Sequence, residues 1–466
     1  MRVREIVPII IPAVIFIIMY LLGFDLRSSL AVSIISFVIS TTLLIWRKRL
    51  AAGIFGLALA FILNILPFEL FLEFMHMDII LFLLGMMVVV GYLEEVNYFE
   101  YVISKIIPFL HGHPRRFYSV FIGLGALFAA IVDEVTAILF TSVIMLELSS
   151  IYKIEPRKFL LPITYAVIVG GTATVMGNPV AILVAFNGGL TMYDFFIWAT
   201  PITLFTLAIL IGYTFLYLRK DLEILYTRMG EVDVKEIVEV LSKEIENPRK
   251  PTILFLSVLI PIIIHGEIAK FLNMLGIYVK PKLILVSVAL LAAAYIIAFE
   301  EDMGMAVFLH RVDWQTLVFL MSFFSLVGTL EYVGLLNLIS RSLVETSGGE
   351  VEILFLLISG ITAFLSPILD NVLTVATISP IIIELSNLGI DAYHLWFGTL
   401  FAGVFSALAT PIGTSASLVM LGLLEKRRLK AITIGEWVKM GLPLAILVTS
   451  LALFTVYVRA YGLNFM

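Results

Sequence analysis

Long apolar stretches without charge recur along the whole chain, and most approach the length that crosses a lipid bilayer. A helix of about 20 apolar residues spans the hydrocarbon core. We interpret eleven stretches as crossings: residues 6–24, 28–46, 50–68, 79–93, 159–193, 195–218, 252–264, 283–299, 314–330, 395–424 and 440–458. They predict an all-α polytopic membrane protein whose main partner is the lipid bilayer.

The composition supports this interpretation. Of the 466 residues, 61% are hydrophobic and 14% are charged, whereas soluble domains average about 45–50% and about 25%. The chain contains no cysteine, which excludes disulfides and thiolate metal sites. Its basic residues form scattered clusters rather than one patch, which argues against nucleic acid as a partner. We expect no cofactor.

Two pairs of shorter apolar limbs are separated by acidic residues. The pairs are residues 117–132 with 135–146, and residues 353–369 with 372–383. These limbs predict two re-entrant hairpins with Asp133 and Asp370 at their tips. Each hairpin precedes a long uncharged stretch that is interrupted by helix-breaking residues, and we expect a broken helix there. The breakers are Gly170, Gly171, Gly177 and Pro179 in the first stretch, and Pro411 and Gly413 in the second.

The charge distribution predicts the orientation, because cytoplasmic loops carry an excess of Lys and Arg. With a cytoplasmic N-terminus, only six of the 30 Lys and Arg fall outside: Arg27, Lys270, Lys280, Lys282, Arg341 and Arg459. We therefore expect a multi-pass protein of the cell membrane whose C-terminus is extracytoplasmic. The uncharged N-terminal run is longer than the core of a signal peptide, so residues 1–27 are predicted to be a retained transmembrane helix.

The two halves of the chain match at a nearly constant offset. Adding 237 carries Gly91 to Gly328, Glu94 to Glu331, Asp133 to Asp370 and Glu147 to Glu384, and adding 236 carries Thr174 to Thr410 and Gly177 to Gly413. Each copy holds five crossings and one hairpin. An odd number of crossings turns the second copy upside down, which is the inverted-repeat architecture of secondary transporters.

The domain organisation follows from this repeat. Residues 28–218 form the first copy and residues 252–466 the second. Residues 219–251 form the only long hydrophilic segment, and we predict a cytoplasmic linker with an amphipathic helix. The apolar positions of that helix are Val234, Ile237, Val238, Leu241 and Ile245.

The hairpin tips are the candidate ion site. Asp133 and Glu134 lie at one tip, and Asp370 and Asn371 at the other. A carboxylate at this depth costs at least a few kcal/mol, so it needs a cation, a proton or a polar cavity. Asp133 and Asp370 are the predicted ligands of a transported cation. The alternative is that both only cap the second limb of their hairpins.

Neutral oxygens near the tips and the helix breaks complete the predicted site. They belong to Thr136, Thr172, Thr174, Asn178, Thr374, Thr410, Thr414 and Ser415. Helix N-termini exposed at the breaks could hold an anion instead, and a simple kink packed on small residues is the structural alternative.

Two symmetric glutamate pairs lie farther away. At about 1.5 Å per residue, Glu147 is ~20 Å from Asp133, so we interpret Glu147 and Glu384 as solvated helix ends. Glu94 and Glu331 are nearer, but a structural role is favoured for them too.

At these motifs the chain resembles the arsenite permease and NhaD-type sodium/proton antiporter group of the ion transporter superfamily. That superfamily also holds the P protein and, more distantly, the dicarboxylate/sodium symporters. The motifs are Val312-Asp313-Trp314-Gln315-Thr316-Leu317, Leu369-Asp370-Asn371-Val372, Gly170-Gly171-Thr172-Ala173-Thr174 and Thr410-Pro411-Ile412-Gly413. The resemblance implies a homodimer with a scaffold domain and a mobile transport domain. It also implies a site between both tips and both broken helices.

Together these features predict a secondary active transporter, most simply a sodium/proton antiporter that carries Na+ and H+. The dicarboxylate branch has Ser-Asn-Thr at its tips, whereas this chain has Asp133 and Asp370, which disfavours an organic dianion. An anion permease for arsenite or a carboxylate is the alternative. An enzyme is not expected, because the Gly-x-Gly-Asp signature of intramembrane aspartyl proteases is missing around both aspartates.

Overall fold

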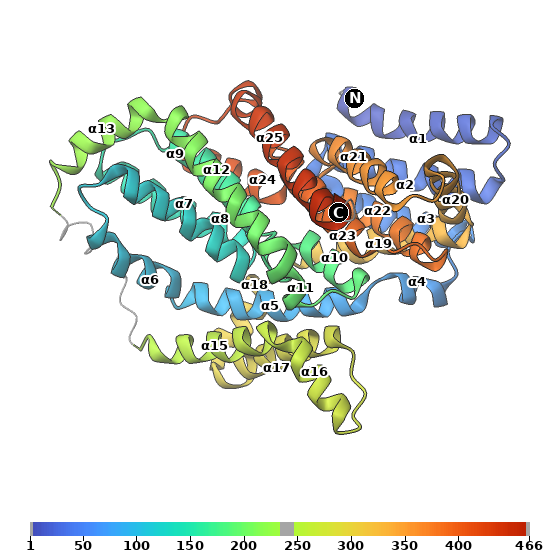
Figure 1. Ribbon diagram of the computed structural model, residues 1–466, viewed down its shortest axis with the longest axis horizontal. Coiled ribbons are helices and arrows are strands. Elements are labelled where there is room, and N and C mark those ends of the chain that lie inside the picture. Colours follow the sequence, from blue (N-terminus) through green and yellow to red (C-terminus); the bar gives the residue numbers. More distant parts are fainter. Residues whose placement is uncertain (1–2, 234–246, 463–466) are drawn as a thin grey trace.

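The computed structural model describes residues 3–233 and 247–462, which form helices and turns without any strand (Figure 1). The fold class predicted from the sequence, an all-α membrane protein, is confirmed. The chain begins with α1 (Val3–Leu21), which packs along the following helix. The linker begins with α13 (Arg219–Met229). All five positions of its predicted amphipathic helix lie outside the described residues.

The first copy of the repeat is a series of helices that includes the first hairpin and the first broken helix. Its helices are α2 (Leu26–Leu44), α3 (Arg49–Ile62), α4 (Phe68–Phe74), α5 (Met77–Glu95), α6 (Tyr98–Ile106), α7 (Pro114–Ile131), α8 (Glu134–Ile151), α9 (Pro156–Gly170), α10 (Pro179–Gly188), α11 (Met192–Asp194) and α12 (Thr200–Tyr217), with short turns η1 (Trp46–Lys48), η2 (Ile107–Phe109) and the π-helical η3 (Phe195–Ala199).

The second copy repeats this order. Its helices are α15 (Arg249–Ile263), α16 (His265–Met274), α17 (Pro281–Phe299), α18 (Glu301–His310), α19 (Trp314–Tyr332), α20 (Leu335–Ser347), α21 (Val351–Leu369), α22 (Asn371–Asn387), α23 (Tyr393–Ser406), η4 (Ala407–Ala409), α24 (Ser415–Lys426) and α25 (Ile434–Tyr461).

The helix bounds follow the sequence offset. Adding 237 to the bounds of α5 gives 314–332, the bounds of α19. The same shift carries the bounds of α8 onto those of α22 to within one residue. Adding 236 to the first residue of α10 gives the first residue of α24. The repeat therefore extends from residue types to the helices that those residues form.

Within residues 3–233 and 247–462, eight helices are long and apolar enough to cross a membrane, or nine if α15 and α16, bent by 66°, count as one span. Six of the eight coincide with predicted crossings. The other two, α8 and α21, are hairpin limbs, which at 18 and 19 residues are longer than the sequence pattern indicated. Each half of a broken helix is too short to cross a membrane by itself, and so is α3 with 14 residues.

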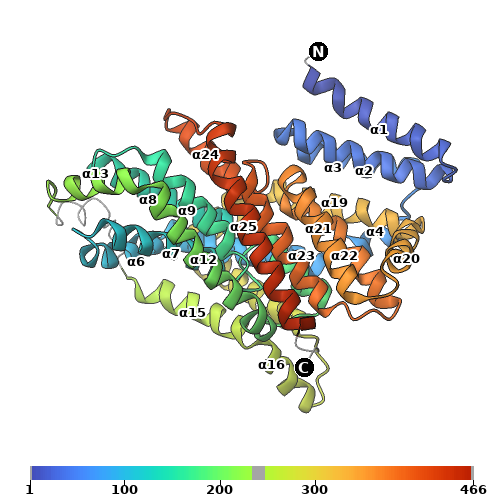
Figure 2. The same ribbon diagram turned by 45° about the horizontal axis from the view of Figure 1, so that its top comes forward.

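The two copies meet around α5 and α19. Helix α17 of the second copy packs along α5 of the first, and α3 of the first copy packs along α19 of the second. Helices α1–α3 form one edge of the molecule and α15–α16 another (Figures 1 and 2). The second hairpin, α21 and α22, lies on the side of α1–α3, and the first hairpin, α7 and α8, lies toward the opposite end of the molecule (Figure 1).

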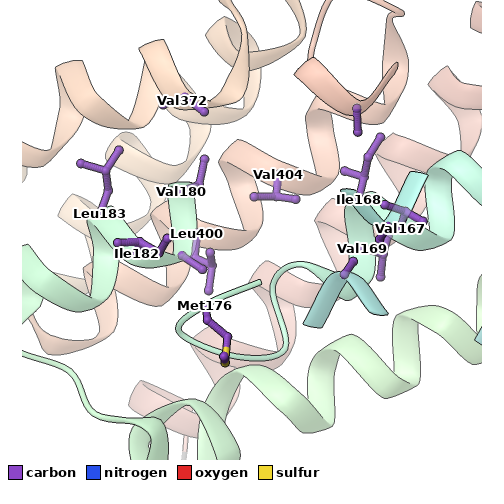
Figure 3. Packing of buried hydrophobic residues seen from close by; sticks show 14 of the residues in the cluster. Val167, Ile168, Val169, Met176, Val180, Ile182, Leu183, Val372, Leu400 and Val404 are labelled. Carbon is purple, nitrogen blue, oxygen red and sulfur yellow. The ribbon is translucent and has the colours of Figure 1, made fainter. Parts of the chain in front are cut away.

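The break between α9 and α10 lies in a tightly packed apolar environment. Val180 and Leu183 on α10 are buried next to the loop that carries Met176, and Leu400 and Val404 of α23 lie beside them (Figure 3). The backbone at the break is therefore shielded from lipid by protein, as irregular backbone at membrane depth requires.

Candidate ion-binding site

Each hairpin tip is closed by the aspartate that the sequence places there. Asp133 Oδ1 accepts hydrogen bonds from the backbone N–H of Val135 at 2.7 Å and of Thr136 at 3.0 Å. Asp370 Oδ1 accepts one from Val372 at 2.9 Å. Both aspartates therefore act as N-caps, which is the alternative that the sequence left open. Asp370 does so at a φ of +81°, a strained conformation for a residue with a side chain.

The hairpins are tied to the broken helices by the same hydrogen bond in both copies. Thr174 donates its hydroxyl to the carbonyl of Ala130, and Thr410 donates its hydroxyl to the carbonyl of Pro367. The two threonines are repeat mates, and each acceptor lies three residues before a tip aspartate. The bonds hold each break against the first limb of its own hairpin.

Glycines let the backbone fold back on itself at the breaks. A Cβ on Gly177 would overlap the carbonyl of Gly171, and one on Gly413 would overlap the carbonyl of Ala407. Asn178 caps the start of helix α10, and its Oδ1 accepts a hydrogen bond from Ala181 N at 2.7 Å. The Asn371 backbone N–H donates to the Gly413 carbonyl at 2.9 Å, which joins the second tip to the second break.

A cavity of about 430 Å³ lies beside the two tips, and we call it the tip cavity. Six of the predicted site residues line it: Asp133, Glu134, Thr136, Asn178, Asp370 and Ser415. Residues far apart in the sequence, from both hairpins and both broken helices, thus meet in one space.

The other six predicted residues are absent from the wall of this cavity. Four threonines use their hydroxyls within the protein: Thr172 with Val169 and Thr203, Thr174 with Ala130, Thr374 with the Asp370 carbonyl, and Thr410 with Pro367. Thr414 caps α24 and bonds Ser417 at 2.8 Å. Asn371 is fully buried just behind its tip.

Several buried polar atoms around the tips have no hydrogen-bond partner. They are Glu134 Oε2, Asn178 Nδ2, Asp370 Oδ2, and both Oδ1 and Nδ2 of Asn371. Glu134 is 1% exposed and Asp370 3%. Native proteins pair nearly all such groups, so a cluster of unpaired ones needs an explanation such as a ligand or water.

The ion pairs of the described residues do not include the three tip carboxylates. The described residues also hold no group of three or more His, Asp or Glu side chains placed to bind a metal. Any cation here would be held by a mixed set of carboxylate, amide and hydroxyl oxygens.

Sequence reasoning missed Arg49, which reaches the tip cavity from the start of α3. Its Nη2 donates to Thr316 Oγ1 at 2.7 Å, and its guanidinium lies 4.0 Å from the centre of the Trp46 ring. In the sequence Arg49 belongs to a basic loop cluster, which gave no signal of this position. Thr316 and Asp313 line the cavity as well, and the motif that carries the family resemblance contains both.

Of the four outlying glutamates, one lines the tip cavity. Glu94 lies at its mouth and pairs with Arg311 at 3.3 Å. Glu331 and Glu384 line a different pocket, and Glu384 accepts a hydrogen bond from Asn337 Nδ2 at 2.6 Å. Glu147 is absent from both.

Comparison with known proteins gives the family. The model of the citrate transporter family matches residues 37–334 and 274–464. An uncharacterized transporter of Mycobacterium tuberculosis is 29% identical over 392 residues, which cover 83% of this chain and 87% of the relative. A second uncharacterized transporter of that organism is 30% identical over 355 residues, 75% of this chain and 78% of the relative.

More distant matches extend the comparison. The human P protein is 21% identical over 439 residues, which cover 80% of this chain and 52% of the P protein. The YdaH transporter of Alcanivorax borkumensis has a TM-score of 0.48 and 16% identity, and the match covers 81% of this chain and 84% of that one. The predicted resemblance to the ion transporter superfamily is confirmed. Because the family model matches nearly the whole sequence, this chain belongs to the citrate transporter family of membrane transporters.

Proposed function

We propose that the chain is a secondary active cation/proton antiporter that carries sodium, bound between the two hairpin tips. One observation carries this proposal: buried polar atoms without partners cluster at the tips, and one carboxylate oxygen of Glu134 and one of Asp370 are among them. A buried carboxylate without a partner is stabilised by a cation or by a proton. A site that accepts either, one at a time, exchanges the two.

The charge of the tip cavity supports a cation. Its wall carries five carboxylates and two guanidinium groups, those of Glu94, Asp133, Glu134, Asp313 and Asp370, and of Arg49 and Arg311. The Arg49 guanidinium bonds Thr316 and lies over Trp46. It also interacts electrostatically with Asp313 and Asp370. The carboxylate oxygens are hard ligands of the kind that suits alkali cations. Asn178 is a neighbour of the Glu134 carboxylate rather than a ligand, because its Oδ1 already accepts from Ala181 N and its Nδ2 is a donor.

The second candidate is an anion permease for a carboxylate or arsenite. Two observations favour it: the chain belongs to the citrate transporter family, and the guanidinium groups of Arg49 and Arg311 both line the tip cavity. Arginine is well suited to bind carboxylates in a bidentate way. In this reading the tip aspartates only cap their helices.

Location and assembly complete the proposal. We expect the protein in the cell membrane, with a cytoplasmic N-terminus and an extracytoplasmic C-terminus, on the basis of the charge distribution between crossings. We also expect a homodimer, as the resemblance implies. In that orientation the tip cavity opens toward the cytoplasm, because Glu94 and Arg311 at its mouth lie in cytoplasmic connections.

A transport assay on purified protein in liposomes tests the function. Acid-loaded vesicles should lose their pH gradient when sodium or lithium is added, and citrate or arsenite should have no effect. If the anions alone discharge the gradient or enter the vesicles as label, the second candidate replaces the first. Vesicles without protein serve as the control.

A further inference from the structure

A second, smaller pocket lies between the second hairpin and α19. It has a volume of about 180 Å³, and we call it the opposite pocket. Its wall includes His76, Leu183, Glu331 and Ala376, and neither tip aspartate contributes to it. It plays no part in the proposed ion site.

Six of the fifteen residues that line the opposite pocket are repeat mates of residues that line the tip cavity. The same offsets that relate the two copies relate the two walls. The pairs are Leu139 with Ala376, Glu94 with Glu331, Met87 with Phe324, Asp313 with His76, Arg311 with Phe74, and Val419 with Leu183. The two hollows are therefore pseudo-symmetric counterparts.

The two hollows lie at opposite ends of the central helices. Thr316 lines the tip cavity near the start of α19, and Glu331 lines the opposite pocket near its end. At about 1.5 Å per residue, the two positions are ~22 Å apart along the helix. Helix α19 is long and apolar enough to cross the membrane, so the two hollows face opposite sides of the bilayer.

The two hollows differ in the residue that packs against a glycine of the central helix. At the tip cavity, Arg311 packs over Gly91 and pairs with Glu94 and Glu95, and the Arg311 and Glu95 side chains are 42% and 44% exposed. This mouth is open to solvent. At the opposite pocket, the Phe74 ring of α4 packs against Gly328, the mate of Gly91. A bulky apolar ring thus occupies the place that a solvated arginine occupies on the other side.

We propose that the opposite pocket is the closed counterpart of the tip cavity and forms the second access route of the transported cation, with Phe74 as its plug. Movement of Phe74 away from Gly328 opens this route toward Asp370 while the tip cavity closes. The access route rests on the proposed transport function, but its opening can be measured without knowing the ion.

Cysteine labelling tests this proposal, since the chain has no cysteine of its own. Ala376→Cys reports on the opposite pocket, and its mate Leu139→Cys reports on the tip cavity. A membrane-impermeant thiol reagent is added to one face of vesicles at a time. Leu139→Cys should react from one face, and Ala376→Cys should react slowly from the other face.

Two changes should then open the opposite pocket. Phe74→Ala removes the plug, and Gly328→Ala displaces it because the new methyl overlaps the ring. Each should raise the labelling rate of Ala376→Cys severalfold and lower that of Leu139→Cys. Gly91→Ala, the matched control, disturbs Arg311 and should leave the Ala376→Cys rate unraised.

The outcomes separate this proposal from the transported ion. An Ala376→Cys rate that neither change raises, or labelling of both cysteines from the same face, overturns the second access route. Labelling as expected, in a protein that fails to exchange sodium for protons, keeps the access route and rejects the sodium proposal.

Discussion

At each hairpin tip, one aspartate has two tasks. One carboxylate oxygen of Asp133 or Asp370 caps the following helix, and the side chain also lines the tip cavity. In Asp370 the second oxygen is buried without a partner. Capping and ion binding are therefore compatible, because they use different oxygens of the same group.

Both predicted aspartates line the tip cavity, whereas most of the predicted threonines do not, for a physical reason. A carboxylate in an apolar run is conspicuous because burying its charge is costly. A threonine hydroxyl can satisfy itself on a nearby carbonyl, and Thr174, Thr374 and Thr410 do so. Arg49 could not be predicted, since only tertiary packing carries it from a basic loop to the cavity.

Arg49 gives a prediction that distinguishes the two candidate functions. Arg49→Gln removes the positive charge that lies deepest in the tip cavity, so a sodium antiporter should bind sodium severalfold more tightly. An anion permease should instead lose its affinity for the anion. The apparent sodium affinity of exchange in liposomes is the measurement, and Arg47→Gln, an exposed neighbour in the same loop, is the control. Weaker sodium affinity in Arg49→Gln would contradict the cation assignment.

At the scale of elements, the sequence predicted both breaks but not the lengths of the hairpin limbs. Gly and Pro mark the ends of α9 and the starts of α10 and α24 because they free the backbone from the helical ladder. The limbs α8 and α21 extend past the apolar runs, since polar residues such as Glu147 and Glu352 continue them as helix. The length of an apolar run therefore indicates how much of a helix can lie in the hydrocarbon core, but the helix itself can continue beyond that run.

The breaks depend on glycine because the backbone approaches itself there. A Cβ at Gly413 would overlap the Ala407 carbonyl, and removing such an overlap requires a backbone shift that costs about 1–3 kcal/mol. Gly413→Ala should therefore lower the thermal unfolding temperature in detergent and reduce transport. Gly422 lies in α24, the helix that follows the break, with open space around its Cβ, so Gly422→Ala should be neutral or slightly stabilising. Equal behaviour of the two variants would show that the break tolerates a side chain.

At the scale of the whole molecule, the repeat was visible in the sequence because charged residues are scarce. Coincident acidic positions at one offset anticipated helix bounds that coincide at the same offset, as in α5 and α19. The meeting of the two tips in one cavity was expected only from the resemblance. Spacing along the chain does not say which helices pack together.

The inverted arrangement makes a topological prediction. Thr346 and Arg427 are both exposed, and an odd number of predicted crossings separates them, so cysteines introduced there should lie on opposite sides of the membrane. An impermeant thiol reagent should label Thr346→Cys from outside the cell and Arg427→Cys only from the cytoplasmic face. Labelling of both from one face would rule out the inverted repeat.

The central claim is that a cation lies between the two tips, and the most direct test is equilibrium binding of radioactive sodium to the purified protein. Asp133→Asn and Asp370→Asn keep size and capping ability, since Asn caps as well as Asp, but remove the charge. Loss of a buried charge partner costs about 2–5 kcal/mol, which is roughly 30-fold or more in affinity. The wild type and Glu147→Gln should bind sodium in competition with protons, and each aspartate variant should lose that binding while purifying normally. Sodium binding that is unchanged in both aspartate variants would contradict the account.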